Sequence, residues 1–269
     1  MGPANPIQLC DVQAVYSGVE CRLWELLMGE QIHIGGLQSS TALAQAAQIG
    51  PGTSGVDLCC CTGAGMRFLV RFCQVGRMHG VDATAAVVET GRRRCQEEGL
   101  GDRIDFTVGD ACTTGLPEGG VDFVWGEDAW CYVIDKPALV AEAVRLVRPG
   151  GTIAFTDWVA GSVGMSDGEM QRFLKFMKFP DVQSLSGYVD LLTGNGCDVV
   201  VSEDTGMFTP CIDLYLDMVE RQLTYDALKI LGFDSEMLGA VAEEMKFMLG
   251  LAQQGKVIQG RFVAQKAQA

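Results

Sequence analysis

Short apolar runs alternate with amphipathic stretches from about residue 50 onward. The apolar runs are of strand length, and the amphipathic stretches repeat their apolar positions at helical spacing. The strands predicted in this way are 55–59, 77–81, 104–108, 121–125, 152–156, 198–202 and 257–264. The predicted helices are 66–73, 83–98, 136–146, 166–179, 185–194, 212–231 and 235–253. This alternation predicts an α/β fold in which helices cover both faces of a doubly wound, parallel sheet.

The pattern divides the chain of 269 residues into a central region and two flanking ones. Residues 46–160 hold the regular strand–helix alternation and form the predicted sheet domain. Residues 1–45 and the helices of residues 161–269 are predicted to form a helical lid over the active edge of the sheet. The second flanking region also supplies the last strands.

The carboxyl ends of parallel strands are where ligands bind in such sheets, so the residues that follow each strand are the first candidates. They are the loop from Cys59 to Gly65, and the acids Asp82, Asp110 and Glu127. A glycine-containing loop before a helix lets backbone amides approach a ligand, and the helix amino end favours negative charge. Asp82 can accept both ribose hydroxyls of an adenosine cofactor, and Asp110 can accept from the adenine amino group. A nicotinamide dehydrogenase would share this geometry.

The segment Leu146–Thr152 adds a Pro-Gly-Gly turn before the fifth strand, and with the other motifs it resembles the class I, Rossmann-like methyltransferases. A closer resemblance is to the sarcosine/dimethylglycine and phosphoethanolamine N-methyltransferases. It is carried by residues 15–17, 29–35 and 126–132 and covers nearly the whole chain. It implies S-adenosyl-L-methionine as cofactor and S-adenosyl-L-homocysteine as product. Some cofactor-binding residues are implied by the resemblance, and others are expected from their places at the strand ends. Together they are Tyr16, Ile32, Asp57, Cys59, Gly63, Asp82, Ala83, Asp110, Ala111 and Glu127.

Three positions depart from the pattern of these families. Cys59 and Cys61 stand where glycine is usual, and a cysteine side chain narrows the approach of the cofactor. Tyr132 stands where the phosphoethanolamine branch has a histidine. A phenol with an ordinary pKa of about 10 is a poor base near neutrality. The departure therefore favours an acceptor with no proton to lose, such as a tertiary amine like dimethylglycine, or a sulfide.

The expected reaction is methyl transfer to a small-molecule acceptor, with an amine nitrogen favoured. Tyr16, His33 and Tyr132 are the candidate catalytic residues, although His33 considered by itself is also a candidate for a structural lid histidine. Aromatic side chains can contact an ammonium through cation–π interactions, and arginine suits a carboxylate. The candidate substrate residues are Trp130, Tyr132, Tyr188, Arg172 and Arg221. An S- or O-methyltransferase (including one acting on arsenite) and a non-catalytic S-adenosylmethionine-binding protein remain alternatives.

Charge and composition restrict the kinds of partner that the protein is expected to bind. The formal net charge of −14 opposes binding to nucleic acid. Eleven scattered cysteines without a CxxC pair, and only two histidines, predict no metal site and reduced thiols. No apolar run is long enough to span a bilayer, and no basic-then-apolar signal is visible, so a cytoplasmic protein is expected. Monomer and homodimer are both left open.

Overall fold

The computed structural model describes residues 7–268, and its centre is a seven-stranded sheet in the order β3-β2-β1-β4-β5-β7-β6. The strands are β1 (Ser54–Leu58), β2 (Arg77–Asp82), β3 (Ile104–Val108), β4 (Val121–Glu127), β5 (Val147–Ala160), β6 (Cys197–Asp204) and β7 (Val257–Lys266). The first five strands are parallel, and β7 runs antiparallel to both β5 and β6. The predicted α/β Rossmann-like class is confirmed. The expectation of a wholly parallel sheet is wrong, because the last strand enters between β5 and β6 in the opposite direction.

The predicted Pro-Gly-Gly turn is a bulge inside β5 and not a separate loop before it. Val147 pairs with Val121 of β4, and the next pairing of the two strands is Thr152 with Phe123. The extra residues of β5 bend out of the ladder, and Gly150 takes a φ of 72°, which is costly for any residue with a Cβ atom.

Helices cover both faces of the sheet, as the alternation predicts. The helices up to residue 97 are α1 (Leu9–Ser17), α2 (Val19–Met28), α3 (Gly36–Ala46), α4 (Ala64–Phe72) and α5 (Ala85–Glu97). Those that follow are α6 (Lys136–Leu146), α7 (Asp167–Met177), α8 (Leu185–Gly194), α9 (Phe208–Asp217), α10 (Thr224–Ile230) and α11 (Ser235–Gln253), with a 3₁₀ turn at Trp130–Tyr132. Apolar residues of α3, α4 and α5 pack on one face, and those of α6 and α8 pack on the other.

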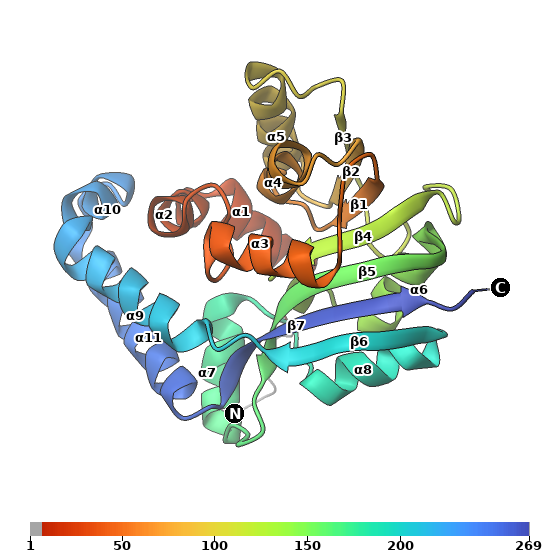
Figure 1. Ribbon diagram of the computed structural model, residues 1–269. Helices are drawn as coiled ribbons and strands as arrows, with labels where there is room; N and C mark the ends of the chain where they lie inside the picture. The colour runs from red at the N-terminus through yellow and green to blue at the C-terminus, as the bar shows by residue number, and fades with distance from the viewer. Residues whose placement is uncertain (1–6, 269) are drawn as a thin grey trace.

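A third apolar cluster lies beyond the sheet and joins α2, α7, α9, α10 and α11. Figure 1 shows these helices gathered at the end where the parallel strands finish, with α1 and α2 facing α9–α11. The single helix predicted for 212–231 is interrupted there. A π-turn at Met218–Gln222 separates α9 from α10. The Thr224 hydroxyl donates a hydrogen bond to the carbonyl of Val219, which a backbone amide would use in a continuous helix.

The lid predicted for residues 1–45 corresponds to α1, α2 and most of α3, and its first six residues lie outside the described part of the chain. Helix α1 reaches the sheet domain through Gln13, whose side-chain amide donates to the carbonyl of Ala83 at 2.8 Å. None of the helices within residues 7–268 has the length and apolar character needed to cross a bilayer.

Candidate active site

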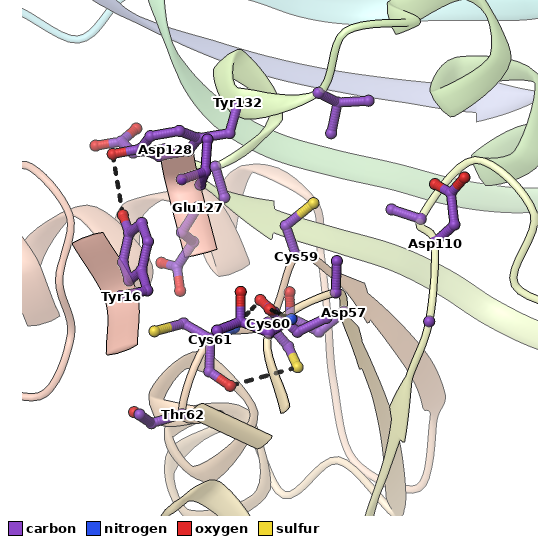
Figure 2. A pocket seen from close by; sticks show the side chains of 18 of the residues that line it. Tyr16, Asp57, Cys59, Cys60, Cys61, Thr62, Asp110, Glu127, Asp128 and Tyr132 are labelled. Atoms are coloured by element: carbon purple, nitrogen blue, oxygen red, sulfur yellow. Dashed lines mark hydrogen bonds between the residues drawn. The ribbon is translucent and has the colours of Figure 1, made fainter. Parts of the chain in front are cut away.

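A cavity of about 680 Å³ lies at the carboxyl ends of β1, β2 and β4. Each of these strands supplies an acid to its wall: Asp57, Asp82 and Glu127. The predicted residues that line the cavity are Tyr16, Ile32, His33, Asp57, Cys59, Asp82, Ala83, Asp110, Ala111, Glu127 and Tyr132. In Figure 2, Cys59 and Asp110 lie on one side of the cavity, and Tyr16 and Tyr132 lie on the other. The fold therefore brings residues from several elements of the first half of the chain to one place.

The loop after β1 follows a glycine-like backbone path although two of its residues with positive φ are cysteines. Cys59, Cys61 and Gly63 have φ values of 64°, 48° and 72°. The backbone amides of Cys59 and Cys60 both reach the carbonyl of Val81, at 2.8 and 3.2 Å, which ties the loop to the end of β2. Gly63 does not line the cavity. A Cβ atom there would come within 2.6 Å of the Phe106 ring, so this glycine lets the chain turn into α4.

Asp82 is fixed by two backbone amides, one to each carboxylate oxygen. Cys61 N donates to Oδ2 at 2.9 Å, and Thr84 N donates to Oδ1 at 2.8 Å. Burial raises the pKa of Asp82, and these two hydrogen bonds oppose that rise. Because each oxygen keeps a second lone pair, the carboxylate can accept a pair of hydroxyl groups from the cavity while staying in place.

Acidic groups dominate the cavity. Its acidic lining residues are Glu30, Asp57, Asp82, Asp110, Glu127, Asp128 and Asp135, and within residues 7–268 neither lysine nor arginine lines it. Burial raises the pKa of Asp57 well above its usual range, and the charges of Glu127 and Asp82 raise it further. Gly65 allows α4 to approach these acids, since a Cβ atom there would lie 2.5 Å from Glu127 Oε2. The site is therefore suited to a ligand that carries positive charge.

Glu127 is held by two residues of the segment between α2 and α4. Ser40 Oγ donates to Glu127 Oε1 at 2.6 Å, and His33 Nε2 lies 3.3 Å from the same oxygen. His33 Nε2 is also 3.1 Å from Ser40 Oγ, and Nδ1 is 3.2 Å from the carbonyl of Ile34. Both ring nitrogens of this buried histidine thus have protein partners, an arrangement that positions Glu127.

Asp128 is a cavity residue that the sequence reasoning missed. It is buried with a φ of 51°, and its carboxylate accepts from the backbone amide of Ile34 at 2.8 Å and from the side chain of Gln259 at 2.8 and 3.0 Å. Burial raises its pKa. Its position directly after Glu127, at the end of β4, is the sequence signal that could have identified it.

Tyr16 and Tyr132 contact each other in one wall of the cavity. The Tyr16 hydroxyl donates to the Tyr132 hydroxyl at 3.0 Å, and the two rings lie edge to face with centroids 5.5 Å apart. Burial raises the pKa of both phenols, so both stay protonated near neutrality. They can donate hydrogen bonds and contact a cation, but they are not suited to remove a proton.

Four predicted substrate residues lie away from this cavity. Trp130 is stacked on Phe155 at 4.0 Å in the sheet core, and the buried Tyr188 hydroxyl donates to Asp157 at 2.6 Å. Arg172 pairs with Glu244 at 2.9 Å, and Arg221 pairs with Asp217 of its own helical stretch at 3.1 Å. Trp130 and Tyr188 are drawn into the core by their apolar rings, and the two arginines are occupied by surface acids.

Comparison with known proteins defines the class of the sheet domain. Residues 56–155, from β1 into β5, match the family model described as a methyltransferase domain. The resemblance to methyltransferases seen in the motifs is thus confirmed over these residues.

Two curated relatives are named for methyl transfer to nitrogen. Phosphoethanolamine N-methyltransferase 1 of Arabidopsis thaliana is 24% identical over 256 residues, which are 91% of this chain and 50% of the relative. Dimethylglycine N-methyltransferase of Parasynechococcus marenigrum is 33% identical over 135 residues, covering 49% of this chain and 47% of the relative. The chain spans about half the length, or less, of the first curated relatives it matches.

The fold has a similar counterpart among solved structures. Haemonchus contortus phosphoethanolamine N-methyltransferase 2, solved with phosphomonomethylethanolamine and S-adenosylhomocysteine, superposes with a TM-score of 0.85. The identity is 19%, and the match covers 95% of this chain and 59% of that one. The sheet and the helices around the cavity therefore follow an architecture seen in methyltransferases.

Proposed function

We propose that this protein is an S-adenosylmethionine-dependent methyltransferase that acts on the amine nitrogen of a small molecule. The observation that carries the proposal is the Asp82 carboxylate, which two backbone amides aim into a cavity rich in acids and free of lysine and arginine among residues 7–268. The cavity volume of about 680 Å³ is within the range of small-molecule sites, about 300–1,000 Å³. The names of the relatives support the same activity.

The lining residues suit each part of this cofactor. Asp82 would accept the ribose hydroxyls, and Asp110 would accept from the adenine amino group. The acids Asp57 and Glu127 favour the positive sulfonium, while the amino end of α4 favours the methionine carboxylate. When bound, S-adenosylmethionine supplies an electrophilic methyl group. The residues of the chain hold it and exclude water around it.

The acceptor would approach from the side of Tyr16 and Tyr132. Methyl transfer needs the nitrogen lone pair in line with the methyl carbon at about 3–3.5 Å. Because both phenols are held protonated and both nitrogens of His33 have protein partners, these three residues orient the acceptor and its surroundings. The nitrogen must therefore arrive with its lone pair free, as a tertiary amine in its unprotonated form does. The proposed catalytic contribution is positioning.

Calorimetric titration with S-adenosylmethionine tests the cofactor assignment. We expect Asp82→Asn to weaken binding by about 100-fold, because two hydrogen bonds to a charged acceptor contribute about 3 kcal/mol together. The matched control Asp105→Asn, at an exposed position of the neighbouring strand β3, is expected to bind as the wild type does. Failure of the wild-type protein to bind, or equal binding by Asp82→Asn, would overturn the assignment.

Release of S-adenosylhomocysteine then tests the acceptor class, with glycine, sarcosine, dimethylglycine, phosphoethanolamine, N,N-dimethylisobutylamine, a thioether, a phenol and arsenite as acceptors. Turnover confined to amines supports N-methylation. Turnover of the thioether, phenol or arsenite alone would end the amine assignment and leave the methyltransferase assignment standing.

A further inference from the structure

A second, smaller cavity adjoins the first on the side of Tyr16 and Tyr132. The two cavities share Tyr16, Ile32, His33, Asp128 and Tyr132. The volume of this inner pocket is about 40 Å³, which is room for a group of about the size of a water molecule or a methyl. It can therefore receive one N-methyl group of an amine but not a large ring.

The wall of the inner pocket is apolar and aromatic. Trp24, Trp158 and Phe176 contribute rings, and four methionines contribute flexible thioethers. Within residues 7–268, its lining contains no lysine or arginine, and its only carboxylate is Asp128. An anion placed here would lose its hydration with no cation to replace it, whereas an ammonium would face aromatic rings and an acid.

The positive side chains closest along the route lie in an outer groove of about 1330 Å³. Trp24, Tyr132, Phe176 and Met177 line both the groove and the inner pocket, so the two are separated by one shared wall. Arg172, Lys175 and Lys178 line the groove but not the pocket, and Arg172 already pairs with Glu244. Among residues 7–268, the walls of the inner pocket therefore offer neither lysine nor arginine to a carboxylate or phosphate that lies a few bonds from the reacting nitrogen.

We infer that the acceptor is an amine with an apolar substituent and without a carboxylate or phosphate within a few bonds of its reacting nitrogen. This inference rests on the proposed methyltransferase function. One N-methyl group occupies the inner pocket beside Asp128, and the apolar substituent lies against the wall that Trp24 and Phe176 form. The chain thus differs in acceptor class from what the names of its relatives describe, phosphoethanolamine and dimethylglycine.

Two tertiary amines of nearly equal shape test the inference. N,N-dimethylisobutylamine replaces the two carboxylate oxygens of dimethylglycine with methyl groups. With S-adenosylhomocysteine bound to saturation, we expect calorimetry to show the isobutylamine binding at least tenfold more tightly than dimethylglycine. Equal or tighter binding of dimethylglycine, or no binding of either amine, would refute the inference. Prior titration with S-adenosylhomocysteine alone separates this result from failure of the proposed function, which would abolish cofactor binding as well.

A variant supplies the missing cation. Met177 is half-buried in the wall shared by the pocket and the groove, so Met177→Lys can be accommodated with its ammonium near the pocket. The expected result is a reversed order of affinities, with dimethylglycine bound more tightly than the isobutylamine. Met177→Leu, similar in size and uncharged, is expected to keep the wild-type order. An unchanged order in a folded Met177→Lys protein would show that the inner pocket does not select the acceptor.

Discussion

Replacing Cys61 with glycine and, separately, with alanine tests whether the loop after β1 is strained. The φ of 48° at Cys61 lies in the left-handed region, which glycine occupies without steric cost. Both substitutions remove the thiol, so the difference between them isolates the effect of a Cβ atom on this backbone. We expect Cys61→Gly to be more stable than Cys61→Ala.

The expected difference is a balance of two effects. A Cβ atom in the left-handed conformation costs roughly 1–2 kcal/mol. Glycine loses about 0.5–1 kcal/mol more than alanine in backbone entropy on folding. The balance favours glycine at position 61 by roughly 0.5–1 kcal/mol. Cys95 is the matched control, since it lies within α5, where alanine is favoured over glycine by about 1 kcal/mol.

Thermal unfolding of the four variants measures both differences, and each kcal/mol shifts the midpoint by about 2–4 °C in a protein of this size. The order should invert between the two sites, with glycine the more stable at 61 and alanine the more stable at 95. The two differences should then be separated by about 1.5–2 kcal/mol. If alanine is also the more stable residue at 61, the loop is not strained, and the argument that Cys61 stands in a glycine position fails.

Two further results follow from the buried acids and phenols. Tyr132→Phe should keep at least about a tenth of kcat and leave the pH profile of the methyl transfer unchanged. The reason is that the raised pKa of this phenol excludes it as a base. Loss of all activity in steady-state assays would contradict this expectation. Burial raises the pKa of Asp157 to about 7, so its contribution to stability is present below about pH 4 and is lost as the pH rises to 7. Urea unfolding should therefore show wild-type stability falling from pH 5 to pH 8 more steeply than that of Asp157→Asn, by roughly 2.5 kcal/mol, and parallel pH dependences would argue against a buried, perturbed Asp157.

Local sequence patterns were enough to predict most of the fold and of the main cavity. The strand–helix alternation placed β1 to β5, and the rule for strand ends led to Asp82, Asp110 and Glu127, all of which line the cavity. These predictions succeeded because a residue at the end of a parallel strand is placed by the sheet itself. The antiparallel direction of β7 depends on contacts between distant segments and leaves no local mark.

The acceptor side was harder to predict for the same reason. Trp130 and Tyr188 have the residue types of a cation site, but packing with Phe155 and hydrogen bonding to Asp157 place them in the core. Arg172 and Arg221 have the charge to bind a carboxylate, but acids close to each of them form their ion pairs. Side-chain type alone does not show which neighbours a residue meets across the fold.

The position of β7 has a consequence for how the protein is made. Gln259 of this strand holds Asp128 and the carbonyl of Ile34, joining three parts of the chain that lie more than ninety residues apart in every pairing. The same strand fills the space between β5 and β6. When residues 1–256 have emerged from the ribosome, every acid of the cavity has therefore emerged, but the strand that fixes Asp128 has not. The part of the cavity around Asp128 can take its final form only after β7 has been made, while the loop that holds Asp82 needs only β1 and β2.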